Sequence, residues 1–64
     1  MKVRYHCSDI CNAMVRDIIT LDVSGPEEAC SEENWQRAKR KFARKYKTQV
    51  KYVDITGVER EGSA

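Results

Sequence analysis

Hydrophobic and polar residues alternate one by one at the start of the chain. In "KVRYHC", residues 2–7, Val3, Tyr5 and Cys7 alternate with charged or polar neighbours. A period of two is typical of a strand with one face covered and the other face in water. The following "SDICNA" supplies short polar side chains that bond to the nearby backbone and favour turns. The pattern predicts a first strand over 2–7 that ends in a turn.

A second apolar segment, "MVRDIITLDV" at residues 14–23, is rich in branched side chains. These side chains fit the pleated surface of a sheet. Val15, Ile19, Leu21 and Val23 fall on one face, which is interrupted by Asp17. We therefore expect a second, longer strand that forms a hairpin with the first.

The period changes from two to 3.6 after the break at Ser24-Gly25-Pro26. Ser31 stands where the N-cap of a helix belongs, and the acidic residues 32 and 33 favour the positive end of the helix dipole. We expect an amphipathic helix over about 32–47. At about 100° per residue, its apolar stripe consists of Trp35, Ala38, Phe42 and Tyr46.

The last apolar segment, "QVKYVDITGV" at residues 49–58, predicts a third strand. The resulting fold class is α+β with the order ββαβ. It is a three-stranded antiparallel sheet of order 2-1-3, with one amphipathic helix packed on one face. We expect Trp35, Phe42 and Tyr46 to pack on this sheet and to leave its other face partly open. One domain covers residues 1–59, and residues 60–64 are expected to form a frayed tail.

The length and the cysteine content limit the class of protein. A chain of 64 residues buries only roughly 60% of its unfolded surface, so its core is small and a deep active-site cleft is not expected. No apolar run approaches the ~18 residues of a membrane span, and no signal-peptide core follows residue 1. Three cysteines are an odd number, which does not suit a secreted disulfide scaffold. We expect a cytoplasmic protein with reduced cysteines and no membrane partner.

Four residues have the atom types of a tetrahedral zinc site: His6, Cys7, Cys11 and Cys30. Their spacing argues against zinc, since a second ligand pair is missing and adjacent residues 6 and 7 point to opposite faces of a strand. Residues 17, 22 and 54 are carboxylates, but their spacing matches no metal or acid–base motif, and no third group orients a Cys–His pair. We therefore expect no metal, no cofactor, no catalytic residue and no enzyme activity.

The strongest signal in the sequence is the charge of "NWQRAKRKFARKYK", residues 34–47. This segment carries seven Lys or Arg and no acid, whereas the rest of the chain has five Lys or Arg and ten acids, so +7 and −5 give the net charge of +2. Complementing the helix dipole explains part of the segregation. An exposed helix face that binds no partner, however, is more stable when positive and negative side chains alternate on it, because they attract one another. We expect a partner-binding face made of Arg37, Arg40, Lys41 and Arg44, with Lys45 and Lys47 at its flank.

Two kinds of partner fit a basic helix face. An acidic protein surface matches arginine, which forms bidentate pairs with carboxylates. Nucleic acid is the alternative, although a net charge of +2 is lower than that of most domains that bind it. The expected function is that of a small non-enzymatic binding protein, an inhibitor or regulator. In size and build it is similar to the small inhibitor and adaptor proteins that viruses and mobile elements encode.

Overall fold

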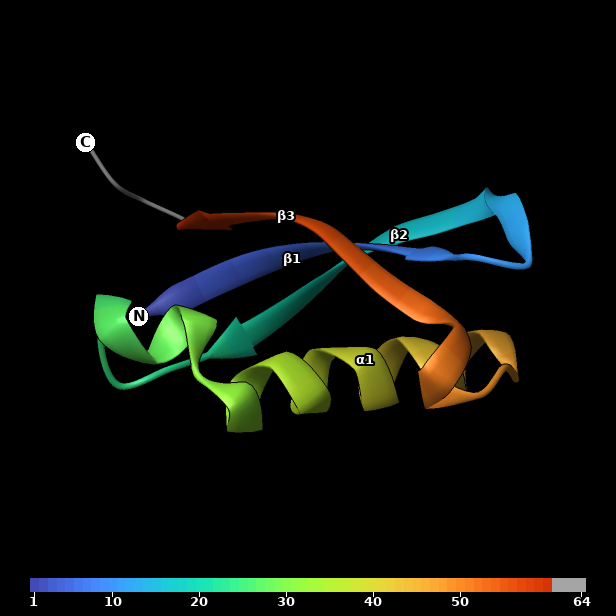
Figure 1. Ribbon diagram of the computed structural model, residues 1–64. Helices are drawn as coiled ribbons and strands as arrows, with labels where there is room; N and C mark the ends of the chain where they lie inside the picture. The colour runs from blue at the N-terminus through green and yellow to red at the C-terminus, as the bar shows by residue number, and fades with distance from the viewer. Residues whose placement is uncertain (61–64) are drawn as a thin grey trace.

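The computed structural model describes residues 1–60, which form an antiparallel sheet covered on one face by a helix (Figure 1). The order of the strands is β2-β1-β3, with the helix connecting β2 to β3, so the predicted ββαβ fold of class α+β is confirmed. The elements are β1 (Lys2–Asp9), β2 (Asn12–Asp22), α1 (Glu32–Tyr46) and β3 (Val53–Arg60), with the short 3-10 helices η1 (Pro26–Cys30) and η2 (Val50–Tyr52) in the connections.

The third strand differs from the sequence prediction at both ends. It begins at Val53 instead of residue 49, because Tyr52 N–H donates to Gln49 O at 2.9 Å and closes a 3-10 turn. It continues to Arg60, which pairs with Val3, and therefore includes the first residue of the predicted tail. Residues 61–64 of that tail lie outside the described residues.

A β-bulge at Thr56 changes which residues of β3 face the helix. His6 pairs with Gly57 and Cys7 pairs with Ile55, so Thr56 is an extra residue on the β3 side. Before the bulge, the odd-numbered residues of β3 face the helix and are buried, as Ile55 is. After the bulge, the even-numbered Val58 faces the helix and packs against the core. The bulge thus keeps apolar side chains on the core face although the sequence breaks the period of two.

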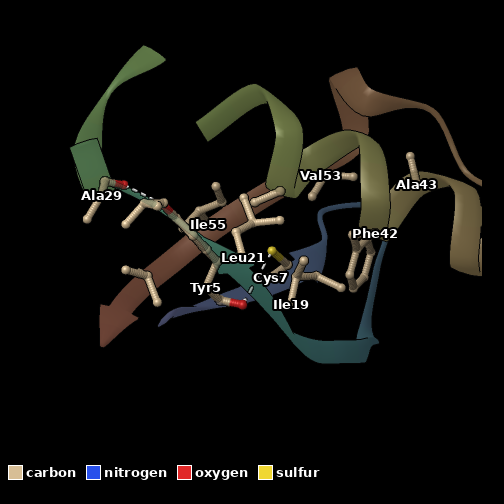
Figure 2. Close-up of a cluster of buried hydrophobic side chains, with 12 residues drawn as sticks. Tyr5, Cys7, Ile19, Leu21, Ala29, Phe42, Ala43, Val53 and Ile55 are labelled. Atoms are coloured by element: carbon tan, nitrogen blue, oxygen red, sulfur yellow. Dashed lines mark hydrogen bonds between the residues drawn. The ribbon is translucent and has the colours of Figure 1, made fainter. Parts of the chain in front are cut away.

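The core lies between the sheet and α1, with Tyr5 and Phe42 as its largest fully buried side chains (Figure 2). Tyr5 points from β1 toward η1, where its hydroxyl donates a 2.6 Å hydrogen bond to the carbonyl oxygen of Ala29. This bond satisfies a polar group that has no contact with water, and an unsatisfied group there would be costly. The core is completed by Val3, Cys7, Ile19, Leu21, Val23, Ala29, Ala38, Ala43, Val53 and Ile55.

Both ends of α1 have identifiable caps. Ser31 is the N-cap, as predicted, and its hydroxyl accepts a hydrogen bond from Asn34 N–H at 3.2 Å. The helix ends at Tyr46 because Lys47 adopts a left-handed conformation with φ of 54°. Thr48 N–H then donates to Ala43 O at 2.9 Å, which satisfies a carbonyl of the last turn.

Of the three aromatic residues expected to pack on the sheet, only Phe42 is fully buried. Trp35 is half-buried and meets Tyr5 edge to face, with 6.3 Å between the ring centroids. Tyr46 is 37% exposed and lies against Phe42, with 4.7 Å between the ring centroids. Positions four residues apart drift by about 40° around a helix, so a stripe that is centred on the core at residue 42 has turned outward by residue 46.

Candidate functional site

The basic residues of α1 gather on the side of the helix that lies next to β2. A groove of about 480 Å³ runs between the helix and the strand, with Leu21 at its base. Four exposed cations line it, and we call them the basic ridge: Arg37, Arg40, Lys41 and Arg44. These are the four central residues of the partner-binding face predicted from the sequence.

The groove continues along β2 toward the C-terminal end of the helix. There Lys41, Arg44 and Lys45 line a second depression of about 360 Å³, whose other side is formed by β2. Ile19, whose buried side chain faces the helix, gives this depression an apolar part, and the edge residues Ile18 and Thr20 complete its lining. Charged and apolar groups thus adjoin one another on this surface.

The two flanking lysines of the predicted face lie differently from the ridge. Lys45 Nζ is 2.5 Å from Asp17 Oδ2, in an ion pair that joins the helix to β2. This placement follows from helical geometry, because a residue seven positions after Ala38 returns to within about 20° of its direction and so faces the sheet. Lys47 is exposed and forms the left-handed cap. Four of the six predicted residues thus line the first part of the groove, Lys45 lines its continuation along β2, and Lys47 lines neither part.

The Asp17 carboxylate has three hydrogen-bond partners. Lys45 and Tyr46 OH donate to Oδ2, and Ile18 N–H donates to Oδ1 at 2.7 Å. These bonds favour the ionised form and lower the pKa of Asp17 from 3.8 to about 2, with the hydrogen bond from Lys45 as the largest cause. The same contact raises the pKa of Lys45. The carboxylate that interrupts the apolar face of β2 is thus a structural anchor for the end of the helix.

None of the ridge residues forms an ion pair with a carboxylate of residues 1–60. Arg37 donates to the neutral side-chain oxygen of Asn34 at 2.8 Å. Lys41 Nζ lies 3.4 Å from the carbonyl oxygen of Thr20, at the long end of hydrogen bonding. The charges of the ridge are therefore not neutralised by the part of the chain that the structure describes.

Strand β2 is at an edge of the sheet, and its hydrogen-bond register shows which backbone groups face outward. Val23 N–H donates to Met1 O at 2.7 Å, and Met1 N donates to Val23 O at 2.9 Å. Residue pairs that exchange both bonds alternate along an antiparallel ladder with pairs that exchange none. Four residues of β2 therefore direct their N–H and C=O groups away from β1, and these groups form the outer edge of the sheet. The four residues are Arg16, Ile18, Thr20 and Asp22.

This edge is not part of the partner-binding face predicted from the sequence, although the predicted order 2-1-3 places β2 beside only one other strand. The helix and β2 match in length along the groove. Four steps of a strand from Asp17 to Leu21 span about 13 Å, and eight steps of a helix from Arg37 to Lys45 span about 12 Å. Asp17 pairs with Lys45 at one end, and Leu21 lines the groove together with Arg37 toward the other end. The ridge therefore runs alongside the outer edge of β2.

The face of the sheet opposite the helix is polar. Glu59 connects two residues of β1 there, since its carboxylate lies 3.0 Å from Arg4 Nη2 and 2.6 Å from His6 Nε2. At the tip of the β1–β2 hairpin, Ile10 and Met14 are exposed. These features lie outside the groove, and the Arg4–Glu59 ion pair partly neutralises the charges of this face.

The cysteines are dispersed. All three are free thiols, with Cys7 buried in the core and Cys11 and Cys30 exposed. Burial raises the pKa of the Cys7 thiol to about 11, and the negative charge of Asp17 adds to this effect. Within residues 1–60, no three His, Cys, Asp or Glu side chains come together in a group that is able to hold a metal ion.

Within the same described range, α1 is too short and too polar to cross a membrane, and so are the two 3-10 helices. Comparisons of the chain with protein-family models, with curated proteins and with solved structures find no match. A function must therefore be inferred from the side chains and backbone groups of this chain.

Proposed function

We propose that this chain is a small non-enzymatic binding protein, of the inhibitor or regulator type, whose basic ridge docks on an acidic surface of a partner protein. The observation that carries the proposal is that Arg37, Arg40, Lys41 and Arg44 line one groove and pair with no carboxylate of residues 1–60. Three of these four residues are arginines, whose planar guanidinium groups form bidentate pairs with carboxylates.

Two properties favour a protein over nucleic acid as the partner. Outside residues 34–47 the chain carries a net charge of −5, which a polyanion would repel. The groove also has an apolar part at Leu21 and Ile19, which suits contact with side chains better than contact with a phosphate backbone. The partner that fits these properties is an acidic protein surface that also offers some apolar side chains.

A pull-down from a native lysate, with and without nuclease, tests the proposal. The informative variant is Arg40→Glu with Arg44→Glu, because both side chains are exposed on the ridge and neither forms an ion pair within residues 1–60. We expect the wild-type chain to retain a protein partner after nuclease treatment and the variant to lose it. Retention of the partner by the variant would refute docking through the ridge.

A matched control changes the net charge equally at other positions. Lys39→Glu with Lys51→Glu serves this purpose, because Lys39 lies on the opposite flank of α1 and Lys51 lies in η2. This control is expected to retain the partner. The purified protein is also tested for binding to DNA or RNA of random sequence. Binding whose affinity falls steeply with salt concentration would support the alternative function, in which the ridge is a nucleic-acid-binding site.

A further inference from the structure

The outer edge of β2 and the basic ridge lie side by side, and together they offer two kinds of binding groups. The edge presents backbone donors and acceptors, and the ridge presents cations on the helix side of the same edge. An exposed edge is a template on which an extended chain can add a further strand. The question is which chain has the chemistry to do so.

The backbone groups that remain available are centred on Thr20. Ile18 N–H is already bonded to the Asp17 side chain at 2.7 Å, so the edge offers Ile18 C=O and Thr20 N–H, with Asp22 further along. Thr20 C=O is contacted by Lys41 only at 3.4 Å, a long bond that an incoming N–H can displace. An added strand therefore finds donors and acceptors over the segment from residue 18 to residue 22.

The side chains of an added strand would alternate between two environments. Every second side chain would point to the helix side, where it meets the ridge, and the others would lie beside Ile18 and Thr20 on the open face. Alternate residues of a strand are about 6.7 Å apart, and the ridge from Arg37 to Arg44 is about 10 Å long. Two or three acids at alternate positions match this length. The residues between them are best apolar or β-branched, because Ile18 is 45% exposed.

We propose that β2 binds an extended acidic segment of the partner as a fourth strand, with carboxylates at alternate positions facing Arg37, Arg40, Lys41 and Arg44. This inference rests on the proposed function and specifies the shape of the partner segment. A second copy of this chain fits less well. Antiparallel pairing of two β2 edges would place both helices on the same face and bring two basic ridges together, which like-charge repulsion opposes.

The test uses the full chain and a synthetic peptide of about nine residues with Glu at alternate positions and Val or Thr between them. Amide hydrogen exchange, followed by NMR, gives the decisive signal. Thr20 N–H points outward and is expected to exchange fast in the free protein and slowly in the complex. Ile19 N–H points toward β1 and is the internal control, protected in both states.

Two changes remove strand pairing but keep all the charges. One is a peptide with the same sequence and N-methylated amides at the pairing positions. The other is Thr20→Pro, which removes an outward N–H that forms no bond to β1, so that circular dichroism is expected to show a folded protein. We expect each change to weaken binding by at least about tenfold. A further control peptide has the same composition but carries its Glu residues in one block. We expect it to bind the wild-type protein as weakly as the N-methylated peptide does.

The outcomes separate this inference from the proposed function. Equal binding of the methylated peptide, with loss of binding in the Arg40→Glu, Arg44→Glu variant, would refute strand addition and leave the docking ridge in place. No binding of the alternating peptide would also refute strand addition, whereas the lysate experiment independently decides the proposed function. Protection of Thr20 N–H that grows with protein concentration in the absence of peptide would identify a second copy as the occupant and overturn the inference.

Discussion

Lys45 Nζ at the C-terminal end of α1 lies 2.5 Å from Asp17 Oδ2 in β2. Tyr46 OH donates to the same oxygen at 2.6 Å, so two consecutive helix residues hold one carboxylate of the sheet. These contacts lower the pKa of Asp17 to about 2, with the Lys45 hydrogen bond as the largest cause. The last turn of the helix is therefore fastened to the sheet by an ionised side chain.

This contact predicts that stability depends on pH in the acid range. A carboxyl group whose pKa is lowered by folding stabilises the protein above its unfolded pKa of 3.8, and this contribution is lost as the pH falls toward about 2. We expect Asp17→Asn to lower Tm by about 5 °C at neutral pH. The melting curves of the variant and the wild type should converge near the folded pKa of about 2.

Asp54→Asn is the control for this experiment, because Asp54 is exposed and forms no ion pair within residues 1–60. Its Tm at neutral pH is expected to stay close to that of the wild type. A constant Tm difference between Asp17→Asn and the wild type at all pH values would show that the ionisation of Asp17 does not stabilise the fold.

Two aromatic residues of the helix are expected to differ in their contribution to stability. Phe42 is fully buried, and Phe42→Ala should cost about 3–5 kcal/mol, which is close to the whole stability of a domain of this size. Trp35 is half-buried at the rim of the core, so Trp35→Ala should cost about 2 kcal/mol. Thermal or urea denaturation of both variants measures this ranking, and the reverse order would place Trp35 at the centre of the core.

The buried hydroxyl of Tyr5 predicts an effect of removing a single atom. Tyr5→Phe deletes the donor to Ala29 O and leaves this carbonyl unsatisfied, at a cost of about 1–3 kcal/mol. Urea denaturation measures the cost, and Tyr52→Phe, at a half-buried position in η2, is the matched control. An unchanged midpoint for Tyr5→Phe would mean that the Ala29 carbonyl finds another donor.

The thiols are expected to react in two groups. Only the thiolate is nucleophilic, and burial, followed by the charge of Asp17, raises the pKa of Cys7 to about 11. We expect an alkylating reagent to modify Cys11 and Cys30 in the native protein and Cys7 only after denaturation. Mass spectrometry of peptides from native and denatured samples measures the modification of each site. Rapid native modification of Cys7 would reveal that the sheet opens locally.

The sequence predicted the number, type and order of the main elements because periodicity reports directly on which side chains are buried. In residues 2–7 the apolar side chains recur at every second position, as strand geometry requires. After Ser31 they recur at about every 3.6 positions, as helix geometry requires. The bulge at Thr56 could not be predicted in this way. It depends on how β3 pairs with β1, and the β3 sequence alone shows only that the alternation fails after Ile55.

The candidate site was predictable for the helix but not for the strand. Arg37, Arg40, Lys41 and Arg44 share one side of a helix by angle alone, and the same angle shows that Lys45 faces the sheet. The proximity of these cations to the outer edge of β2 depends on where the helix lies across the sheet. Packing against all three strands determines that position, and no pattern within residues 34–47 specifies it.

The pairing of Val3 with Arg60 also determines how the domain responds to mechanical force. Because β1 and β3 are antiparallel neighbours, Val3 and Arg60 lie side by side at the same end of the sheet. The hydrogen bonds of the ladder lie perpendicular to the strands, so a force that pulls these two residues apart acts along the bonds. It loads the bonds one at a time and breaks them in sequence from this end. If the chain is tethered through both positions, we expect the β1–β3 ladder to open from this end, at a lower force than a ladder that is loaded along its strands.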